Sequence, residues 1–169
     1  SLTAPILFRV VQKHAPTLLL DEIDTYVYRD KELCGLINSG HKHGGCAFRT
    51  EGGVVRSFAS FAPTAIAGLG VPPVPIHNRS IVIPLLPALP EELKHVFDRQ
   101  NAEIESHIPR KFARWAQDNF ETLTRFRPTL PSGAFNRHAD NWRPLFALAQ
   151  LAGGGSPQIP IGALNHLVL

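Results

Sequence analysis

The sequence contains few cysteines, no methionine and no long apolar run. Its two cysteines, Cys34 and Cys46, are too few for a disulfide framework, so we expect a reducing, cytoplasmic environment. No apolar stretch approaches the roughly 20 residues that cross a bilayer, and no secretory signal is present, so no membrane partner is expected. Because methionine is absent and the chain opens at Ser1, we expect a piece of a longer protein.

The composition is otherwise that of an ordinary globular chain. Its 169 residues are 44% hydrophobic, enough for one domain or for a core with a small appended subdomain. Seventeen basic and 14 acidic residues give a net charge of +3. This mild excess is compatible with a polyanionic partner but does not identify one.

Hydrophobic patterning predicts an α/β arrangement before residue 90. The expected elements are a helix that begins at Thr3-Ala4-Pro5, a strand at residues 17–20 buried on both faces, a helix after Asp30 that ends at Gly40, a β-hairpin over residues 46–59 that turns at Gly52-Gly53, and buried strands at residues 65–67 and 80–83.

Helical patterns follow Pro90, over residues 91–107, 110–125 and 141–152. Pro109 and the loop at 128–133 are expected to separate them. The resulting division is an α/β core at 1–88, a helical subdomain at 89–153 and an unassigned glycine-rich tail at 154–169.

The sharpest chemical signal is Leu18-Leu19-Leu20-Asp21-Glu22. Charge at the end of a buried strand is costly unless it is solvated or used. The pattern resembles the Walker B motif of P-loop ATPases, in which Asp21 would hold Mg²⁺ through a water and Glu22 would orient the attacking water. The alternative is an acidic turn that simply exits into solvent. Asp24 fits a turn or helix cap better than a second metal ligand.

Further segments carry a broader resemblance, namely PTLLLDEIDT, LINSGHKHGG, FAPTAIAGLG, NRSIVIPL and ADNWRPLFALAQLAGG. Together they resemble a family of unknown function associated with helicase and primase proteins of phages and mobile elements. That family looks like the back half of an AAA+-type or superfamily-three-helicase-type ATPase. The resemblance covers the chain to about Gly154 and implies a partial P-loop NTPase (AAA+-like) parallel sheet with an inserted β-hairpin, followed by an α-helical lid.

The resemblance also implies roles for two arginines. Arg79, just before the expected last core strand, matches an arginine finger that reaches a neighbouring subunit and so implies a homo-oligomeric ring. Arg143, at the start of a lid helix, matches the sensor-two position. The alternatives are a surface arginine at a strand start and a structural arginine packed on Trp142. At sensor one the sequence departs from the family, since Gly68-Leu69-Gly70 offers no polar side chain.

The expected hairpin matches one that grips DNA in related helicases. Arg49 and Arg56 flank its turn, and Lys42 and His43 lie just before it. Cations on a protruding hairpin suit a phosphate backbone. The alternative is a solvated hairpin with ordinary surface charges.

No G-x-x-x-x-G-K-[ST] loop occurs, so the chain has no P-loop to cradle ATP. We therefore expect a fragment of a nucleic-acid-dependent ATPase or helicase that uses ATP and Mg²⁺ when complete and is inactive alone. The alternatives are a non-catalytic DNA-binding module and an inactive remnant. A zinc site from Cys34, His41, His43 and Cys46 is disfavoured, because their spacing matches no common zinc pattern.

Overall fold

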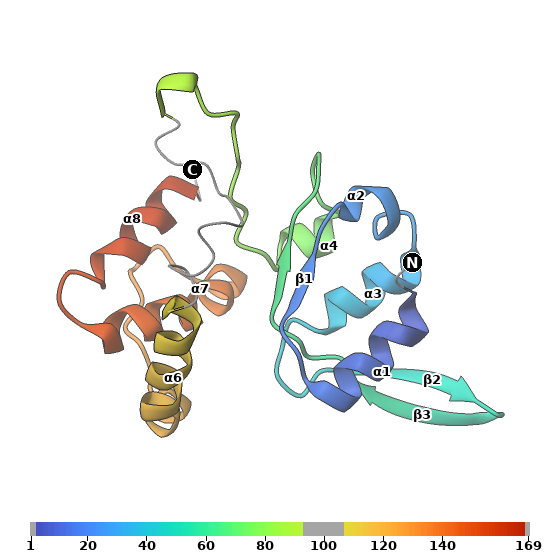
Figure 1. Cartoon of the computed structure of the whole chain (residues 1–169). Coiled ribbons are helices and arrows are strands. Elements are labelled where there is room, and N and C mark those ends of the chain that lie inside the picture. Colours follow the sequence, from blue (N-terminus) through green and yellow to red (C-terminus); the bar gives the residue numbers. More distant parts are fainter. Residues whose placement is uncertain (1–2, 93–106, 168–169) are drawn as a thin grey trace. The chain divides into compact units, whose positions relative to one another are not determined.

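The computed structural model describes residues 3–92 and 107–167 of the chain. It separates into two compact units, Ser1–Ser80 and Ile81–Leu169. Unit 1 is mixed α/β with two small sheets, and the elements of unit 2 are helical (Figure 1). Among the described residues, no helix combines the length and apolar character needed to cross a membrane.

Unit 1 contains α1 Ala4–His14, β1 Leu18–Leu20, α2 Ile23–Tyr26, α3 Lys31–Ser39, β2 Cys46–Glu51, β3 Val54–Ala59, β4 Thr64–Ile66 and α4 Val74–His77. Its core joins the apolar faces of α1 and α3 to β1 and α2. The buried side chains that form it include Leu7, Phe8, Leu20, Ile23 and Leu33.

The first sheet pairs β1 with β4 in parallel, with Leu18 opposite Thr64 and Leu20 opposite Ile66. The strand predicted at 17–20 is confirmed, but its burial on both faces is wrong. Leu20 points into the core, whereas Leu19 is 80% exposed. Successive side chains alternate across a strand, and only the face of Leu20 is packed against the core cluster.

The predicted hairpin is confirmed as the antiparallel pair β2 and β3. Gly52 and Gly53 both have positive φ, 56° and 79°, as the tight two-residue turn requires. Its inner face packs on α1, where the rings of Phe8 and Phe58 lie 5.9 Å apart. The Gln12 Oε1 atom accepts a 2.6 Å hydrogen bond from the Ala59 amide and fixes the end of β3.

The helix predicted between Asp30 and Gly40 is also confirmed. The Asp30 carboxylate accepts hydrogen bonds from the amides of Glu32 and Leu33, which have no partner inside the helix. Gly40 ends α3 with backbone bonds to its last turn. α1 likewise begins after Thr3 with Pro5 in its first turn, although the Thr3 side chain makes no cap hydrogen bond.

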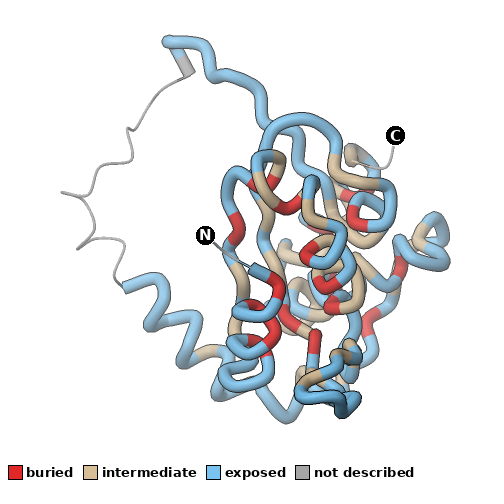
Figure 2. The backbone as a smooth tube through the Cα atoms, turned by 90° about the vertical axis from the view of Figure 1, so that its right-hand side faces the viewer, coloured by how far each residue is buried: buried red, intermediate tan, exposed pale blue. Residues whose placement is uncertain are grey.

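The strand predicted at residues 80–83 is wrong. Residues 81–89 have no regular secondary structure, and the chain is exposed over residues 82–91 (Figure 2). A strand needs a partner, and within the described residues the β1–β4 sheet contains only those two strands. Pro84 also lacks an amide proton, which discourages pairing at this end of the segment.

Unit 2 contains the short 3₁₀-helix η1 Pro90–Glu92 and the helices α6 His107–Arg125, α7 Asn136–Ala152 and α8 Gln158–Leu167. Trp142 and Phe146 of α7 and Leu164 of α8 form its buried core, with ring centroids of the two aromatic side chains 6.4 Å apart.

The helix predictions for unit 2 have mixed outcomes. The helix expected at 91–107 falls mostly on 93–106, outside the described residues, and stays a prediction. Pro109 does not separate two helices but lies in the first turn of α6, where its missing amide proton costs nothing. The helix expected from residue 141 begins at Asn136, and the tail left unassigned at 154–169 contains α8.

Candidate functional site

The carboxyl ends of β1 and β4 lie at the same edge of their sheet, because the strands are parallel. Asp21 and Glu22 follow β1, and residues 67–70 follow β4. The two turns are joined by backbone hydrogen bonds, from the Ala67 amide to the Leu20 carbonyl at 2.8 Å and from the Ile23 amide to the Ala67 carbonyl at 3.2 Å. Ligands of open parallel sheets bind at this kind of edge.

Both carboxylates at this edge are exposed. Asp21 Oδ1 accepts a 2.8 Å hydrogen bond from the Glu22 amide. The Glu22 side chain makes no polar contact with the described part of the chain. The turn therefore offers the Glu22 carboxylate and the second oxygen of Asp21 to a ligand.

Glu22 occupies the left-handed region of the backbone map, with φ 52° and ψ 36°. Its carbonyl accepts hydrogen bonds from the amide and hydroxyl of Thr25, at 3.0 and 2.8 Å. This conformation costs a non-glycine residue about 1–2 kcal/mol. Backbone strain of this kind clusters at functional sites, so a strained, exposed glutamate is a reasonable place to look for chemistry.

Asp24 ties the two turns together. Its Oδ1 atom accepts a 2.9 Å hydrogen bond from the Leu69 amide. A Cβ at Gly68 would lie only 2.8 Å from the same oxygen and 3.1 Å from Ile23 Cγ1, so glycine permits this close approach. Asp24 thus serves the turn, while the segment that follows β4 offers backbone rather than polar side chains.

Asp21 and Glu22 have the donor atoms that Mg²⁺ prefers. This ion is typically held by one or two carboxylates together with phosphate oxygens and waters. No group of three or more His, Cys, Asp or Glu side chains able to hold a metal occurs among the residues described. The pair therefore fits Mg²⁺ only as a part of the ion's coordination, completed by a phosphate ligand.

Arg79 does not precede a strand, which corrects its expected setting. It follows α4, and its Nη1 atom donates a 2.9 Å hydrogen bond to the Pro75 carbonyl of that helix. Its Nε atom is buried without a hydrogen-bond partner in the described structure. The guanidinium group therefore folds back along its own helix.

Arg143 does not start a helix, because α7 begins earlier, at Asn136. It is an exposed residue in the middle of α7, next to the buried Trp142. Its sensor role stays a prediction.

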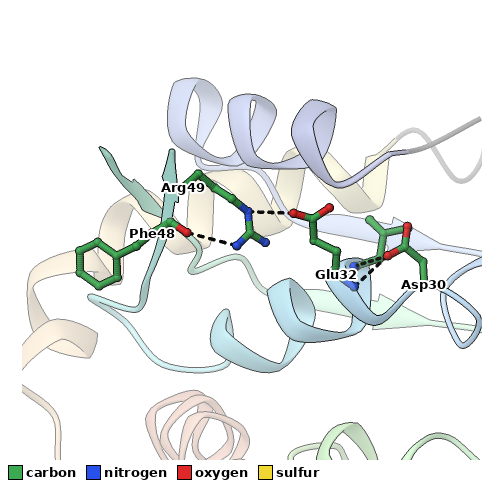
Figure 3. Close-up of polar contacts among 5 residues, drawn as sticks. Asp30, Glu32, Phe48 and Arg49 are labelled. Carbon is green, nitrogen blue, oxygen red and sulfur yellow. Dashed lines mark hydrogen bonds and ion pairs between the residues drawn. The ribbon is translucent and has the colours of Figure 1, made fainter. Parts of the chain in front are cut away.

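The hairpin cations Arg49 and Arg56 are opposite each other in the β2–β3 register, so both side chains lie on the inner face. The Arg49 Nε atom is 3.0 Å from Glu32 Oε1, an ion pair whose N–H is not aligned for a hydrogen bond, and Nη1 donates to the Phe48 carbonyl at 3.1 Å (Figure 3). The guanidinium carbon also lies 4.5 Å from the centroid of the Phe8 ring. Arg49 is thus a bridge between the hairpin, α1 and α3.

The other charges of the inner face are also paired. Glu51 lies between two arginines, with Arg9 Nη2 at 3.3 Å and Arg56 Nε at 3.9 Å. Lys42 and His43 are exposed in the loop before β2, where the His43 ring meets Phe61 edge-on at 5.3 Å. The outer face of the hairpin presents uncharged side chains, namely those of Cys46, Phe48, Thr50, Val55, Ser57 and Ala59.

Cys34 is a structural thiol. Its Sγ atom donates a 3.1 Å hydrogen bond to the Val27 carbonyl at the edge of the core. Burial raises the pKa of this thiol, and the negative charge of Asp30 raises it further. Burial likewise raises the pKa of Tyr28, with added contributions from Asp24 and Cys34.

Comparison with known proteins relates unit 2 to a family without an assigned activity. A family model described as "Protein of unknown function (DUF3631)" matches residues 88–169, just under half of the chain. No curated protein and no solved structure matches the chain. The matched segment includes Arg143 but not Asp21 or Glu22. Residues 88–169 are therefore similar to a domain of unknown function. The interest of the turn at Asp21 and Glu22 rests on its geometry alone, because no comparison covers it.

Proposed function

We propose that this chain supplies the magnesium-binding and water-orienting carboxylates of a nucleic-acid-dependent ATPase with an AAA+-like P-loop sheet. The observation that supports the proposal is the parallel pairing of β1 with β4, which brings Asp21 and Glu22 to the carboxyl edge of a sheet. There the two acids lie beside the backbone of residues 67–70, fixed by Asp24.

The two acids differ in the work they can do. Asp21 has one oxygen committed to the Glu22 amide, so its orientation is fixed and its second oxygen can bind a water of a hydrated cation. Glu22 has no such restraint on its side chain and can accept a hydrogen bond from an attacking water. Mg²⁺, when bound with a nucleotide, would neutralise charge on the phosphates. The protein would contribute the oriented carboxylate of Asp21 to the cation and the unrestrained carboxylate of Glu22 to the attacking water.

The open sheet agrees with this proposal. Parallel sheets are normally covered on both faces, and two strands alone are only marginally stable. Among the described residues β1 and β4 have no further strand at either edge, and Leu19 is exposed on the uncovered face. A strand and helix that carry a phosphate-binding loop would complete the sheet and provide the motif that this sequence lacks.

The test uses a protein in which this chain is joined to its P-loop. Glu22→Gln should keep ATP binding and lower kcat by about 10²–10⁴-fold, the usual contribution of a positioned general base. Glu121→Gln, which changes an exposed acid of α6, is the matched control and should be silent. Undiminished hydrolysis by Glu22→Gln would contradict the proposal, as would ATP hydrolysis at a helicase-like rate by this chain alone.

A DNA-binding module without catalysis is the competing function. Its support is weaker because both hairpin arginines are paired with acids, Arg49 with Glu32 and Arg56 with Glu51. Arg56, Lys42 and His43 are nevertheless exposed and could meet a phosphate backbone. Each phosphate contact should contribute about −0.9 to the slope of log affinity against log salt. A salt-dependent affinity for DNA that Lys42→Ala reduces, in a complete protein that does not hydrolyse ATP, would favour the module.

A further inference from the structure

Residues 82–90, which lead from the loop after α4 into η1, form an exposed run of apolar residues. Every residue from 82 to 90 is exposed, and none of them carries a charge or a polar side chain. Leu85 and Leu86 are 88% and 87% exposed, and Ile83 is 67% exposed. Contiguous apolar surface of this kind on a folded protein usually marks an interaction site. The ATPase proposal makes no use of this segment.

The sequence of the segment favours an extended, polyproline II-like backbone. Pro84, Pro87 and Pro90 recur at every third position and fix φ near −65°. The residue before each proline is disfavoured in the helical region and biased to extended or polyproline II angles. Only Leu85 and Ala88 escape both restrictions. No residue of this segment has positive φ, and none before Pro90 belongs to a helix or strand, both of which a polyproline II helix requires.

A polyproline II helix has three residues per turn, so residues at a spacing of three share one face. The three prolines therefore form one ridge, and Ile83, Leu86 and Leu89 form the ridge next to it. The segment therefore repeats a dipeptide of one apolar residue followed by proline, first at Ile83-Pro84, and the dipeptide recurs once per turn of the helix.

We propose that residues 83–90 are a docking segment for a partner protein with an aromatic-lined groove that recognises a polyproline II helix. Such grooves bind ridges of proline and neighbouring apolar side chains, and the preformed helix loses little entropy on binding. Pairing with a β-strand is disfavoured, because Pro84 and Pro87 face opposite strand edges and each removes an amide donor. A nucleic acid is also disfavoured, because the segment carries no cation.

The test titrates the full chain with a panel of purified SH3 and WW domains, small proteins that carry such grooves. At least one domain should bind, with an affinity insensitive to salt because no charge lies within residues 82–90. The double variant Pro84→Ala with Pro87→Ala should weaken this binding about tenfold or more, because two buried ring contacts are lost. Pro109→Ala, an exposed proline in α6, is the control and should bind like the unmodified chain.

A second variant tests the spacing itself. One alanine inserted between Leu85 and Leu86 keeps all prolines but rotates Pro87 and Pro90 by about 120° around the helix axis. We expect the same loss of binding and an unchanged unfolding midpoint, because the segment is exposed. The proposal is overturned if no domain of the panel binds, or if both variants bind as tightly as the unmodified chain. Neither result bears on ATP hydrolysis.

Discussion

Glycine at position 22 should leave unit 1 more stable than alanine there, although both substitutions remove the same carboxylate. Glu22 has φ 52° and ψ 36°, where a Cβ crowds the following carbonyl at a cost of about 1–2 kcal/mol. Glycine avoids this cost but loses roughly 0.4–1 kcal/mol through the greater entropy of its unfolded chain. The difference favours Glu22→Gly over Glu22→Ala by up to about 1.6 kcal/mol, with a midpoint near 0.8 kcal/mol.

Urea unfolding followed by the NMR signals of unit 1 amides measures this difference, since both tryptophans, Trp115 and Trp142, lie in unit 2. Gly35 provides a control of opposite sign. It lies inside α3, a Cβ there meets no atom within 4 Å, and Gly35→Ala should stabilise by about 0.8–1 kcal/mol. If the alanine variant at position 22 is as stable as the glycine variant or more so, the backbone of Glu22 is not strained and the reasoning is refuted.

Three further predictions concern contacts around the carboxylate turn and the hairpin. Arg49→Ala should destabilise the hairpin by about 1 kcal/mol, measured as faster amide hydrogen exchange in β2 and β3. Arg49→Lys should recover only part of this lost stability, because an ammonium lacks the planar guanidinium contact with the Phe8 ring. Asp24→Ala should speed exchange of the Leu69 amide, whose lost acceptor is worth about 1 kcal/mol, and an unchanged rate would exclude the hydrogen bond. In a Cys46→Ser background, the rate of Cys34 alkylation should reach half of its maximum at a higher pH than that of a free thiol. Burial and the neighbouring Asp30 carboxylate raise the pKa of Cys34, so the reactive thiolate forms only at higher pH. A midpoint equal to that of a free thiol would refute this.

Elements whose signals are local could be predicted from the sequence. The hairpin turn is encoded by Gly52-Gly53, and α3 is encoded by a capping aspartate at one end and Gly40 at the other. Both signals act within a few residues and need no distant partner. Two short apolar runs indicated strands near β1 and β4, but the parallel pairing of these strands and the exposure of one face of their sheet come from the structure.

Features that depend on packing against a distant element could not be predicted from the sequence. Residues 80–83 have the composition of a strand but no described strand beside them. The tail helix α8 follows a glycine run, and its helical character becomes evident only where Leu164 packs on Trp142 and Phe146. Helix boundaries such as that of α7 depend on packing as well as on propensity.

The direction of the hairpin cations was hidden for a different reason. Both faces of the hairpin carry apolar residues, Phe48 and Val55 on one side and Ala47 and Phe58 on the other. Alternation alone therefore does not reveal which face meets the helices, and the side chain of Arg49 could have pointed either way. The family resemblance favoured a projecting cation, whereas the structure pairs Arg49 with an acid and a ring.

The bridge made by Arg49 limits how the hairpin can move. A swing relative to α1 alone would pull the guanidinium off the Phe8 ring, and a swing relative to α3 alone would separate it from Glu32. At the open end of the hairpin, the Ser60 amide donates a 2.9 Å hydrogen bond to the Gly45 carbonyl. This bond joins the start of β2 to the end of β3. A displacement of the hairpin tip should therefore act on α1 and α3 together. We expect the hairpin and these two helices to move as one unit.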